Sequence, residues 1–143
     1  MTHRTLFALP LLPLLTAAGQ TGEVEVRVEK LRSGKGMVHL CLTANPAHFP
    51  DCATDPKAKK RSVAANAMGV VTLPGVSPGA YALSVFHDEN GNTKLDTFLK
   101  IPKEGFGFSR NPTVRFGAPT FSQVRFEVGP GIARQTVRMQ YLL

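Results

Sequence analysis

The chain contains several short stretches in which apolar and polar residues alternate. In residues 22–31, valines at every second position from Val24 to Val28 stand against Glu and Arg. This period of two puts the valines on one face of an extended chain, so it predicts a half-buried β-strand. Strand-forming residues bounded by turn residues also occur in the other segments that we expect to be strands, which are residues 37–43, 61–65, 69–73, 81–86, 121–128 and 132–142.

The order of these segments predicts the fold class. No capped, periodic run of helical length interrupts them in the sequence. Short strands at this spacing are typical of two packed sheets, so we expect an all-β fold, an antiparallel Greek-key β-sandwich of about seven strands. A small barrel is the alternative. The glycines at residues 33–36 indicate a turn, which predicts that the first two strands form a hairpin.

The first 19 residues have the pattern of a signal peptide. His3 and Arg4 give a positive start, residues 6–15 are apolar, and small residues follow at 16–19. The apolar run is too short to span a bilayer, and its small-residue end suits cleavage after Ala18 or Gly19. We therefore expect residues 1–19 to be removed and residues 20–143 to form a single domain in the periplasm or outside the cell. No transmembrane segment is expected in that mature chain.

Composition and cysteine content agree with an exported globular domain. Of the 143 residues, 43% are apolar and 19% are charged, which is typical of a folded protein. The two cysteines, Cys41 and Cys52, enclose a short loop rich in Pro and Asp. In an oxidising compartment such a pair predicts a disulfide. A redox C-x-x-C pair is absent from the sequence, and a metal site would need more Cys or His nearby.

The formal net charge is +7. The basic residues of interest form two groups along the chain, Lys57, Lys59, Lys60 and Arg61, and then Lys94, Lys100, Lys103, Arg110 and Arg115. A basic exported protein is suited to contact cell-envelope polysaccharide or an anionic lipid surface. Nucleic acid is not an expected partner, because no aromatic residues interleave the basic ones as they do in nucleic-acid readers.

Polar residues crowd at regular spacing in residues 87–108, directly after the strand expected at 81–86. Counted from the first aspartate, oxygen donors fall at positions 1, 3, 5 and 9 and a lysine at position 7, namely Asp88, Asn90, Asn92, Asp96 and Lys94. A calcium loop uses side-chain oxygens at 1, 3 and 5, a backbone carbonyl at 7 and often a water held by 9. The spacing predicts a calcium site at these residues. Thr93 and Leu99 depart from that motif, which has Gly at position 6 and a bidentate acid at position 12.

Two other interpretations of this stretch stay open. Asn-Gly steps and Asx residues hydrogen-bond their own backbone, so in one interpretation the loop is purely structural. In the other, Asp88 and Asp96 act as an acid/base pair with His87 as a proton shuttle. The protein would then be a small hydrolase or lyase acting on envelope polymers.

Residues around the polar stretch are candidates for direct ligand contact. They are His87, Phe106, Arg110 and Asn111. Phe106 belongs to an alternation of Gly and Phe that either packs the loop onto the edge of the sandwich or exposes a contact surface. We expect a non-enzymatic, exported β-sandwich module with a polar loop that binds calcium or a ligand, and the hydrolase or lyase is the alternative.

The run PGAYALSVFHDENGNTKLDTFLKIPKEGFGFSRNP, followed by GAPTF, closely resembles a bacterial family of exported proteins, the domain of unknown function 2141. The resemblance extends over essentially the whole mature chain. Residues 73–85, LPGVSPGAYALSV, are also similar to transthyretin-like and carboxypeptidase-regulatory-like sandwiches. The resemblance implies an exported, prealbumin-like β-sandwich and brings no established activity. Thr93, Lys100 and Arg110 stand where the family pattern has Gly, Gly and Asn.

Overall fold

The computed structural model of the chain describes Pro10, Pro13 and residues 19–143. Apart from Pro10, Pro13 and Gly19, the expected signal peptide therefore lies outside the described residues. The described chain is built mainly from β-strands with three short helical segments, so the all-β prediction is confirmed. None of the helices in this part of the chain is long and apolar enough to cross a membrane.

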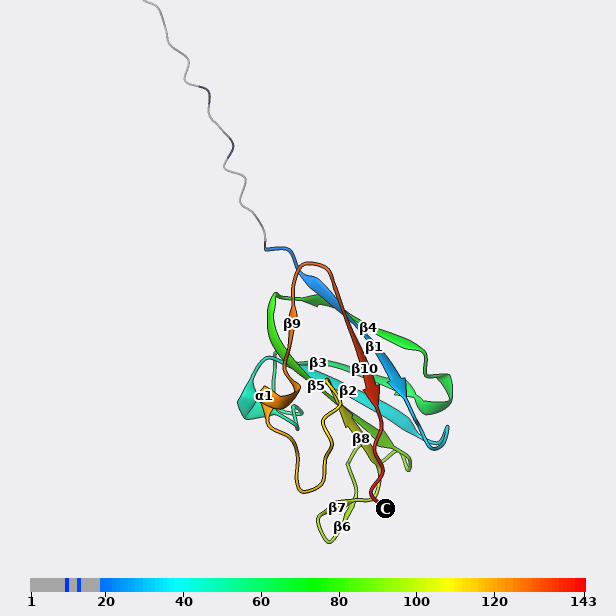
Figure 1. Cartoon of the computed structure of the whole chain (residues 1–143). Helices are drawn as coiled ribbons and strands as arrows, with labels where there is room; N and C mark the ends of the chain where they lie inside the picture. Colours follow the sequence, from blue (N-terminus) through cyan, green and yellow to red (C-terminus); the bar gives the residue numbers. More distant parts are fainter. Residues whose placement is uncertain (1–9, 11–12, 14–18) are drawn as a thin grey trace, which may run out of the picture.

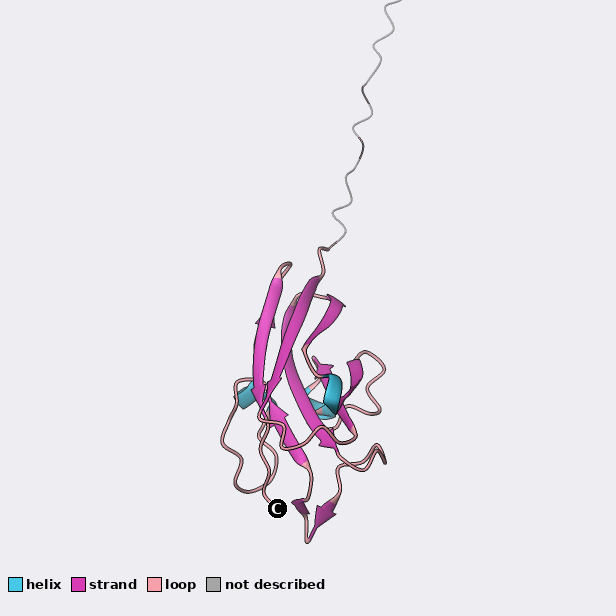
Figure 2. Cartoon of the chain, turned by 90° about the vertical axis from the view of Figure 1, so that its right-hand side faces the viewer, coloured by secondary structure: helices cyan, strands magenta, loops and turns pink. Residues whose placement is uncertain are grey.

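Two sheets pack face to face around one core (Figures 1 and 2). In order across the first sheet, the strands are β10 (Ile132–Arg138), β1 (Gly22–Glu29) and β4 (Val70–Val76). Across the second they are β3 (Lys59–Ala64), β2 (Met37–Thr43), β5 (Gly79–Asp88) and β8 (Gly105–Phe108). The short strand β9 (Phe126–Val128) pairs with the start of β5.

Between β5 and β8 the chain forms a small separate hairpin. Its strands are β6 (Thr97–Phe98) and β7 (Ile101–Pro102), and the hairpin projects beyond the end of the sandwich (Figure 1). The helical segments are η1 (Pro46–His48), η2 (Ala65–Ala67) and α1 (Phe121–Val124). The hairpin and the loops around it, rather than the sheets, carry most of the polar residues singled out in the sequence.

The alternation of apolar residues in the strands builds the main core. Val24 and Val26 of β1 are fully buried, and they share one cluster with Leu40 of β2 and Leu83 of β5 from the facing sheet. Burying a Val or Leu side chain contributes roughly 1.5–3 kcal/mol. The core is therefore the main stabilising element of the fold.

The outer face of the second sheet carries a smaller apolar cluster made of Ala82, Phe106, Phe108 and Val124. Because this cluster and the main core lie on opposite faces, β8 is buried on both sides. The Gly–Phe alternation of β8 suits both faces, because the phenylalanines fill the outer cluster and the glycines leave room for the segment packed on the inner face. A Cβ added to Gly107 would lie 2.5 Å from Cγ1 of Val137, so only glycine lets the C-terminal segment pack this closely on β8.

The prediction that the first two strands form a hairpin is wrong. β1 pairs in parallel with β10 and antiparallel with β4, whereas β2 lies between β3 and β5 in the other sheet. A hairpin would have set the apolar faces of β1 and β2 side by side. Crossing from one sheet to the other sets them face to face, which excludes more apolar surface from water. The parallel β1–β10 pair also means that the sandwich is not antiparallel throughout.

Several strand boundaries differ from the sequence prediction. Residues 121–128 divide into α1 and β9, because the Gln123 side chain accepts the backbone N–H of Thr120 at 2.8 Å and so favours a helical turn there. Strand β4 continues through Pro74 and Gly75, and the C-terminal strand ends at Arg138. Strand β5 continues to Asp88, which places both His87 and Asp88 inside the sheet.

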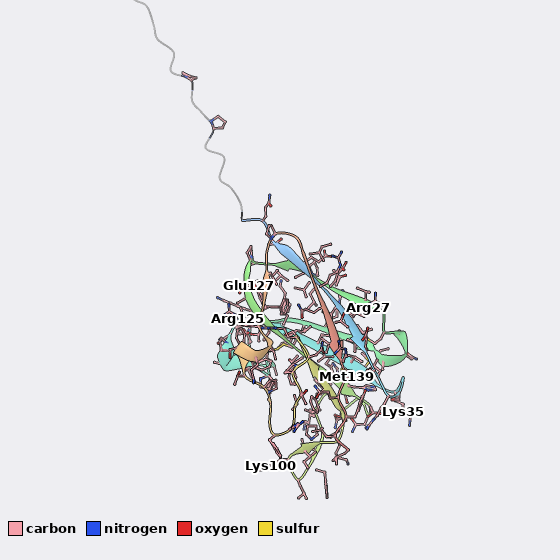
Figure 3. All side chains as sticks on the ribbon, in the orientation of Figure 1. Arg27, Lys35, Lys100, Arg125, Glu127 and Met139 are labelled. Carbon is pink, nitrogen blue, oxygen red and sulfur yellow. A yellow bond between two sulfur atoms is a disulfide. The ribbon has the colours of Figure 1, made fainter. Side chains whose placement is uncertain are left out.

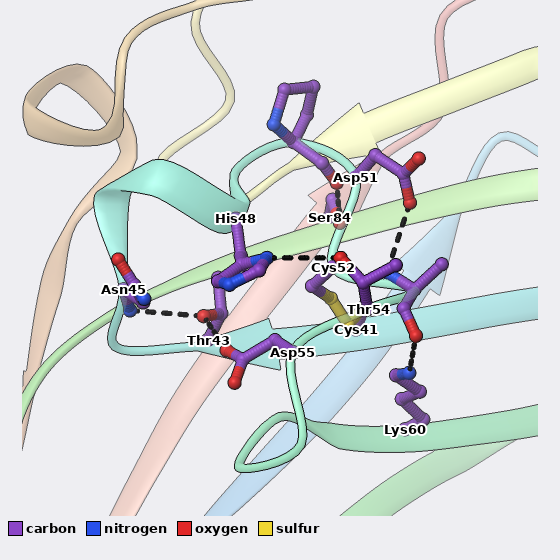
Figure 4. Close-up of a disulfide and its surroundings, with 12 residues drawn as sticks. Cys41, Thr43, Asn45, His48, Asp51, Cys52, Thr54, Asp55, Lys60 and Ser84 are labelled. Atoms are coloured by element: carbon purple, nitrogen blue, oxygen red, sulfur yellow. Dashed lines mark hydrogen bonds between the residues drawn. A yellow bond between two sulfur atoms is a disulfide. The ribbon is translucent and has the colours of Figure 1, made fainter.

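The predicted disulfide between Cys41 and Cys52 is confirmed (Figure 4). It joins the middle of β2 to the loop that follows this strand, with the two Cα atoms 6.4 Å apart. Closing a loop of this length stabilises the fold by roughly 3 kcal/mol in the chain-entropy description.

Candidate functional site

The polar stretch begins inside β5, where neighbouring side chains point to opposite faces of the sheet. Asp88 is fully buried, and its carboxylate accepts three hydrogen bonds. The donors are the backbone N–H of Asn92 at 3.1 Å, the backbone N–H of Thr93 at 2.8 Å and Nε2 of His39 at 3.0 Å. Asp88 thereby closes the first turn of the loop onto the strand.

The same three hydrogen bonds decide the ionisation of Asp88. Burial by itself raises the pKa of this carboxyl, but the hydrogen bonds from His39, Thr93 and Asn92 together outweigh that effect. The pKa of Asp88 therefore lies below its ordinary value, and the group is a carboxylate at neutral pH. A buried negative charge thus anchors the loop.

Thr93 adopts the backbone conformation that the calcium motif normally assigns to glycine. Its φ is 64°, in the left-handed region that a β-branched residue rarely occupies. The hydrogen bond to Asp88 and a second one, from Thr93 Oγ1 to the carbonyl of Asn92, hold it there. The sharp turn expected at position 6 is therefore present even though the sequence has Thr.

The exposed half of the polar loop gathers three of the predicted metal residues. Nδ2 of Asn90 donates to Asp96 Oδ2 at 2.7 Å, and Nδ2 of Asn92 donates to both Asp96 oxygens at 2.9 and 3.0 Å. The two amide oxygens face the opposite way. Asn90 Oδ1 accepts the N–H of Asn92, and Asn92 Oδ1 accepts the N–H of Lys94. Asp96 is thus surrounded by donors from its own loop.

Glu104, which has no regular spacing to the other acids, joins the two halves of the loop. This nearly buried side chain accepts the backbone N–H of Glu89 and that of Asp96, each at 3.1 Å. The backbone of Lys103 adds a further hydrogen bond to the carbonyl of Asp96 at 2.8 Å. Glu104 and this backbone hydrogen bond therefore join the two sides of the loop that carries β6 and β7 at its base.

His87 lies on the other face of β5, away from Asp88. It is fully buried, with Nε2 2.7 Å from the carbonyl of Lys35 and Nδ1 2.9 Å from the Tyr141 hydroxyl. A carbonyl only accepts, so Nε2 donates its proton to the carbonyl of Lys35, and in the neutral ring Nδ1 then accepts from the Tyr141 hydroxyl. These contacts make His87 a link between β5, the turn before β2 and the C-terminal segment.

Arg32 extends this link to the base of the polar loop. Its guanidinium binds Glu89, with Nη2 2.6 Å from Oε1, and donates to the carbonyl of Lys103 at 3.0 Å. The guanidinium carbon also lies 4.5 Å from the centre of the Tyr141 ring. The hydrogen bond from Arg32 is the main reason that the pKa of Glu89 is lowered. Sequence reasoning missed Arg32 and Tyr141, because their partners are far away along the chain.

Residues 26–136 match the sequence model of a bacterial family described as an uncharacterized protein conserved in bacteria (DUF2141). The chain belongs to this family. The match runs from β1 into β10 and includes the whole polar loop, so the family resemblance seen in the sequence is confirmed. No curated protein and no solved structure matches the chain.

In this member of the DUF2141 family, the four residues expected to contact a ligand do not converge. His87 and Phe106 are buried, and Arg110 is exposed just beyond the C-terminal end of β8. Asn111 contacts the free edge of β10, donating from Nδ2 to the carbonyl of Thr136 at 2.7 Å and accepting the N–H of Arg138 at 2.8 Å. Asn111 therefore satisfies backbone groups that a neighbouring strand would otherwise bind.

One shallow hollow lies beside Asn111. It has a volume of about 240 Å³ and is bordered by Lys30, Pro112 and Gln140. Neither Asp88 nor Asp96 lines it. The polar loop of this DUF2141 protein therefore does not border this hollow.

Among the residues that the structure describes, no group of three or more His, Cys, Asp or Glu side chains is placed to hold a metal ion. The donor types of the polar loop suit calcium, which prefers carboxylate, amide and carbonyl oxygens. The orientation of two donors does not suit it, since the amide groups of Asn90 and Asn92 turn nitrogen towards Asp96. A cation beside Asp96 would require both amides to turn over.

Proposed function

We propose that this chain is a non-enzymatic binding module of the cell envelope, working in the periplasm or outside the cell. Its polar loop holds the β6–β7 hairpin in a fixed position on the sandwich. One observation carries the proposal: the buried carboxylates of the loop, Asp88 and Glu104, accept backbone N–H groups of the loop itself. These two carboxylates therefore use their hydrogen bonds to hold the conformation of the loop.

Export is supported by two independent features. The signal-peptide pattern of residues 1–19 predicts passage across the inner membrane. The disulfide between Cys41 and Cys52 is of a kind that persists in oxidising compartments.

The hydrolase or lyase alternative requires His87, Asp88 and Asp96 to reach one substrate. His87 and Asp88 point to opposite faces of β5, and Asp88 is enclosed by its hydrogen-bond donors. Asp96 is the more accessible of the two aspartates, and it is bound by two amide groups. This separation favours a binding module over an acid/base catalyst.

Calcium binding in the same loop is a second candidate, favoured by the left-handed backbone at Thr93 and by the convergence of Asn90 and Asn92 on Asp96. In this form of the proposal the cation replaces the amide nitrogens as the partner of Asp96. Calcium would then bind Asp96 directly, with both amides turned over, and stiffen the loop that carries the hairpin.

Sedimentation with washed cell-envelope fragments tests the binding module. We expect the mature chain to sediment with the fragments and the double variant Phe98→Ser/Leu99→Ser to stay in solution. Both side chains are exposed, so the substitutions leave the fold intact. The matched control is Val70→Ser/Ile132→Ser, which alters two residues of comparable exposure in the first sheet.

The same incubation tests the enzyme alternative. A binding module releases no soluble sugar or peptide from the fragments. Release by the wild-type chain that disappears in Asp96→Asn would overturn the proposal in favour of a hydrolase or lyase.

A further inference from the structure

Exposed apolar side chains are concentrated at one end of the molecule. Of the nine large apolar residues that are exposed in the described chain, seven lie in three segments, namely Leu95, Phe98, Leu99 and Ile101, then Phe116, then Leu142 and Leu143. Figures 1 and 2 show that the β6–β7 hairpin, the loop before α1 and the C-terminal residues all reach the same end of the sandwich. The other two, Val70 and Ile132, belong to strands of the first sheet.

The hairpin reaches furthest, and its turn is unusual. Leu99 is 80% exposed and Phe98 is 60% exposed. The two turn residues, Leu99 and Lys100, have φ values of 49° and 66°, which is the pattern of a type I′ turn. That turn favours Asn-Gly, because L-residues with side chains are strained at positive φ. The chain thus has a leucine and a lysine at the end of the hairpin, in a turn whose backbone conformation favours Asn and Gly.

Phe98 and Leu99 form the apolar tip of the hairpin, and the surface around this tip is basic. Lys94, Lys100 and Lys103 are all exposed, and Figure 3 shows Lys100 at the extreme end of the hairpin. Of the nearby acids, Glu104 is buried against backbone amides and Glu89 is bound to Arg32, which leaves Asp96, partly exposed and bound by two neutral amide groups. The tip therefore presents apolar groups and positive charge together.

We propose that this end of the molecule inserts into the headgroup region of an anionic lipid bilayer. Phe98 and Leu99 would enter the boundary of the acyl chains, while the lysine stems extend along the apolar region and their ammonium groups bind lipid phosphates. The inference rests on the proposed function and names the partner of its contact surface.

A bilayer fits the tip better than an envelope polysaccharide does. An acidic polysaccharide offers anionic groups to the lysines, but it has no apolar interior that would remove both Phe98 and Leu99 from water. A convex tip also suits a soft surface that closes around it. Both apolar and charged groups of the tip gain partners in an anionic bilayer.

The chain has no tryptophan, so a single introduced one reports on its own position. In Leu99→Trp we expect the fluorescence to shift to the blue on vesicles of phosphatidylethanolamine with phosphatidylglycerol, and brominated acyl chains to quench it. Val70→Trp is the control, because Val70 is 52% exposed on β4 and its fluorescence should not change. Raising salt from about 0.05 M to about 0.5 M should weaken binding, because exposed charges are screened.

A second variant separates insertion from folding. Leu99→Asn/Lys100→Gly gives the turn its preferred residues, so the melting temperature should stay the same or rise. Binding to the anionic vesicles should fall about tenfold or more, because one apolar and one charged contact are lost.

Three outcomes would overturn the lipid inference. One is an unchanged Leu99→Trp spectrum on anionic vesicles, and another is undiminished vesicle binding by Leu99→Asn/Lys100→Gly. The third is a blue shift without lipid that grows with protein concentration, which would indicate a second copy of the chain as the partner. If envelope fragments still bind through the tip while pure vesicles do not, the lipid inference fails and the binding module stands. If Phe98→Ser/Leu99→Ser binds the fragments as the wild type does, the proposed function itself fails.

Discussion

Two long loops follow the neighbouring antiparallel strands β2 and β5 and so leave the second sheet at opposite ends. Each is organised by a buried aspartate that accepts hydrogen bonds from nearby residues. In the loop after β2, Asp55 accepts the hydroxyl of Thr43 at 2.6 Å (Figure 4). It also accepts the backbone N–H of Lys57 at 2.9 Å. In the loop after β5, Asp88 has the corresponding role.

The two loops differ in what else holds them. The loop after β2 is bonded covalently to its strand through Cys41 and Cys52, and it folds back on the sheet, where Ser84 donates to the carbonyl of Pro50 at 3.0 Å. No disulfide within the described chain holds the loop after β5, and this loop projects outward with Phe98 exposed. Its base is held by non-covalent contacts, chiefly the carboxylates of Asp88 and Glu104 and the guanidinium of Arg32. The comparison indicates that the first loop completes the fold, whereas the second displays a surface.

Removing the disulfide is expected to have the largest effect on stability. Cys41→Ser/Cys52→Ser should lower the free energy of unfolding by roughly 3 kcal/mol, because the unfolded chain regains the entropy of the open loop. Urea denaturation measures this change. Hydrogen exchange should accelerate in the loop after β2 and stay the same in the loop after β5. Faster exchange in both loops would contradict their independence.

Replacing the buried aspartate of the polar loop is expected to have the next largest effect. Asp88→Asn should lower the free energy of unfolding by about 2 kcal/mol, because an amide cannot accept all three hydrogen bonds and its NH₂ faces other donors. Hydrogen exchange should now accelerate in the loop after β5. Asp96→Asn is the control, since this side chain is partly exposed and the loss should stay within about 0.5 kcal/mol. Equal losses for the two variants would show that Asp88 has no special role.

Acid should weaken the polar loop through the same residue. The pKa of Asp88 is lower in the folded chain than its unfolded value of about 3.9, so the stabilisation it provides is complete above that value and is lost as pH falls through the lower folded pKa. We expect urea midpoints measured between neutral and strongly acidic pH to fall less steeply in Asp88→Asn than in the wild type. Parallel pH profiles of the two proteins would contradict this assignment.

Calcium should give the smallest effect, confined to the polar loop. Millimolar calcium should raise the melting temperature by binding the folded chain in preference to the unfolded one. Asp96→Asn should abolish this rise and leave the calcium-free melting temperature nearly the same. If calcium leaves the melting temperature of the wild type unchanged, calcium binding is ruled out. The proposal that buried carboxylates hold the loop in shape would still stand.

Local sequence determined the strands and the existence of the polar loop. The valine alternation of β1 predicts a half-buried strand because the side-chain period of a strand is a local property. The Asp and Asn spacing predicts a tight loop for a similar reason, and even the turn at Thr93 is held by hydrogen bonds to residues one and five positions before it. The disulfide was predictable because the sequence contains only two cysteines.

Tertiary structure decided which elements meet. Strand β1 pairs with β10 about a hundred residues later, as in the Arg134–Glu25 contact at a separation of 109, and no local pattern encodes that choice. The hydrogen bond from His39 to Asp88 likewise depends on β2 and β5 being neighbours.

The exposed tip was also beyond the reach of the sequence. Phe98 and Leu99 are apolar, and an apolar residue is buried or exposed according to whether another part of the chain covers it. The alternation determined the strands of this protein, and the packing of distant segments determined that the hairpin between β5 and β8 would be left uncovered.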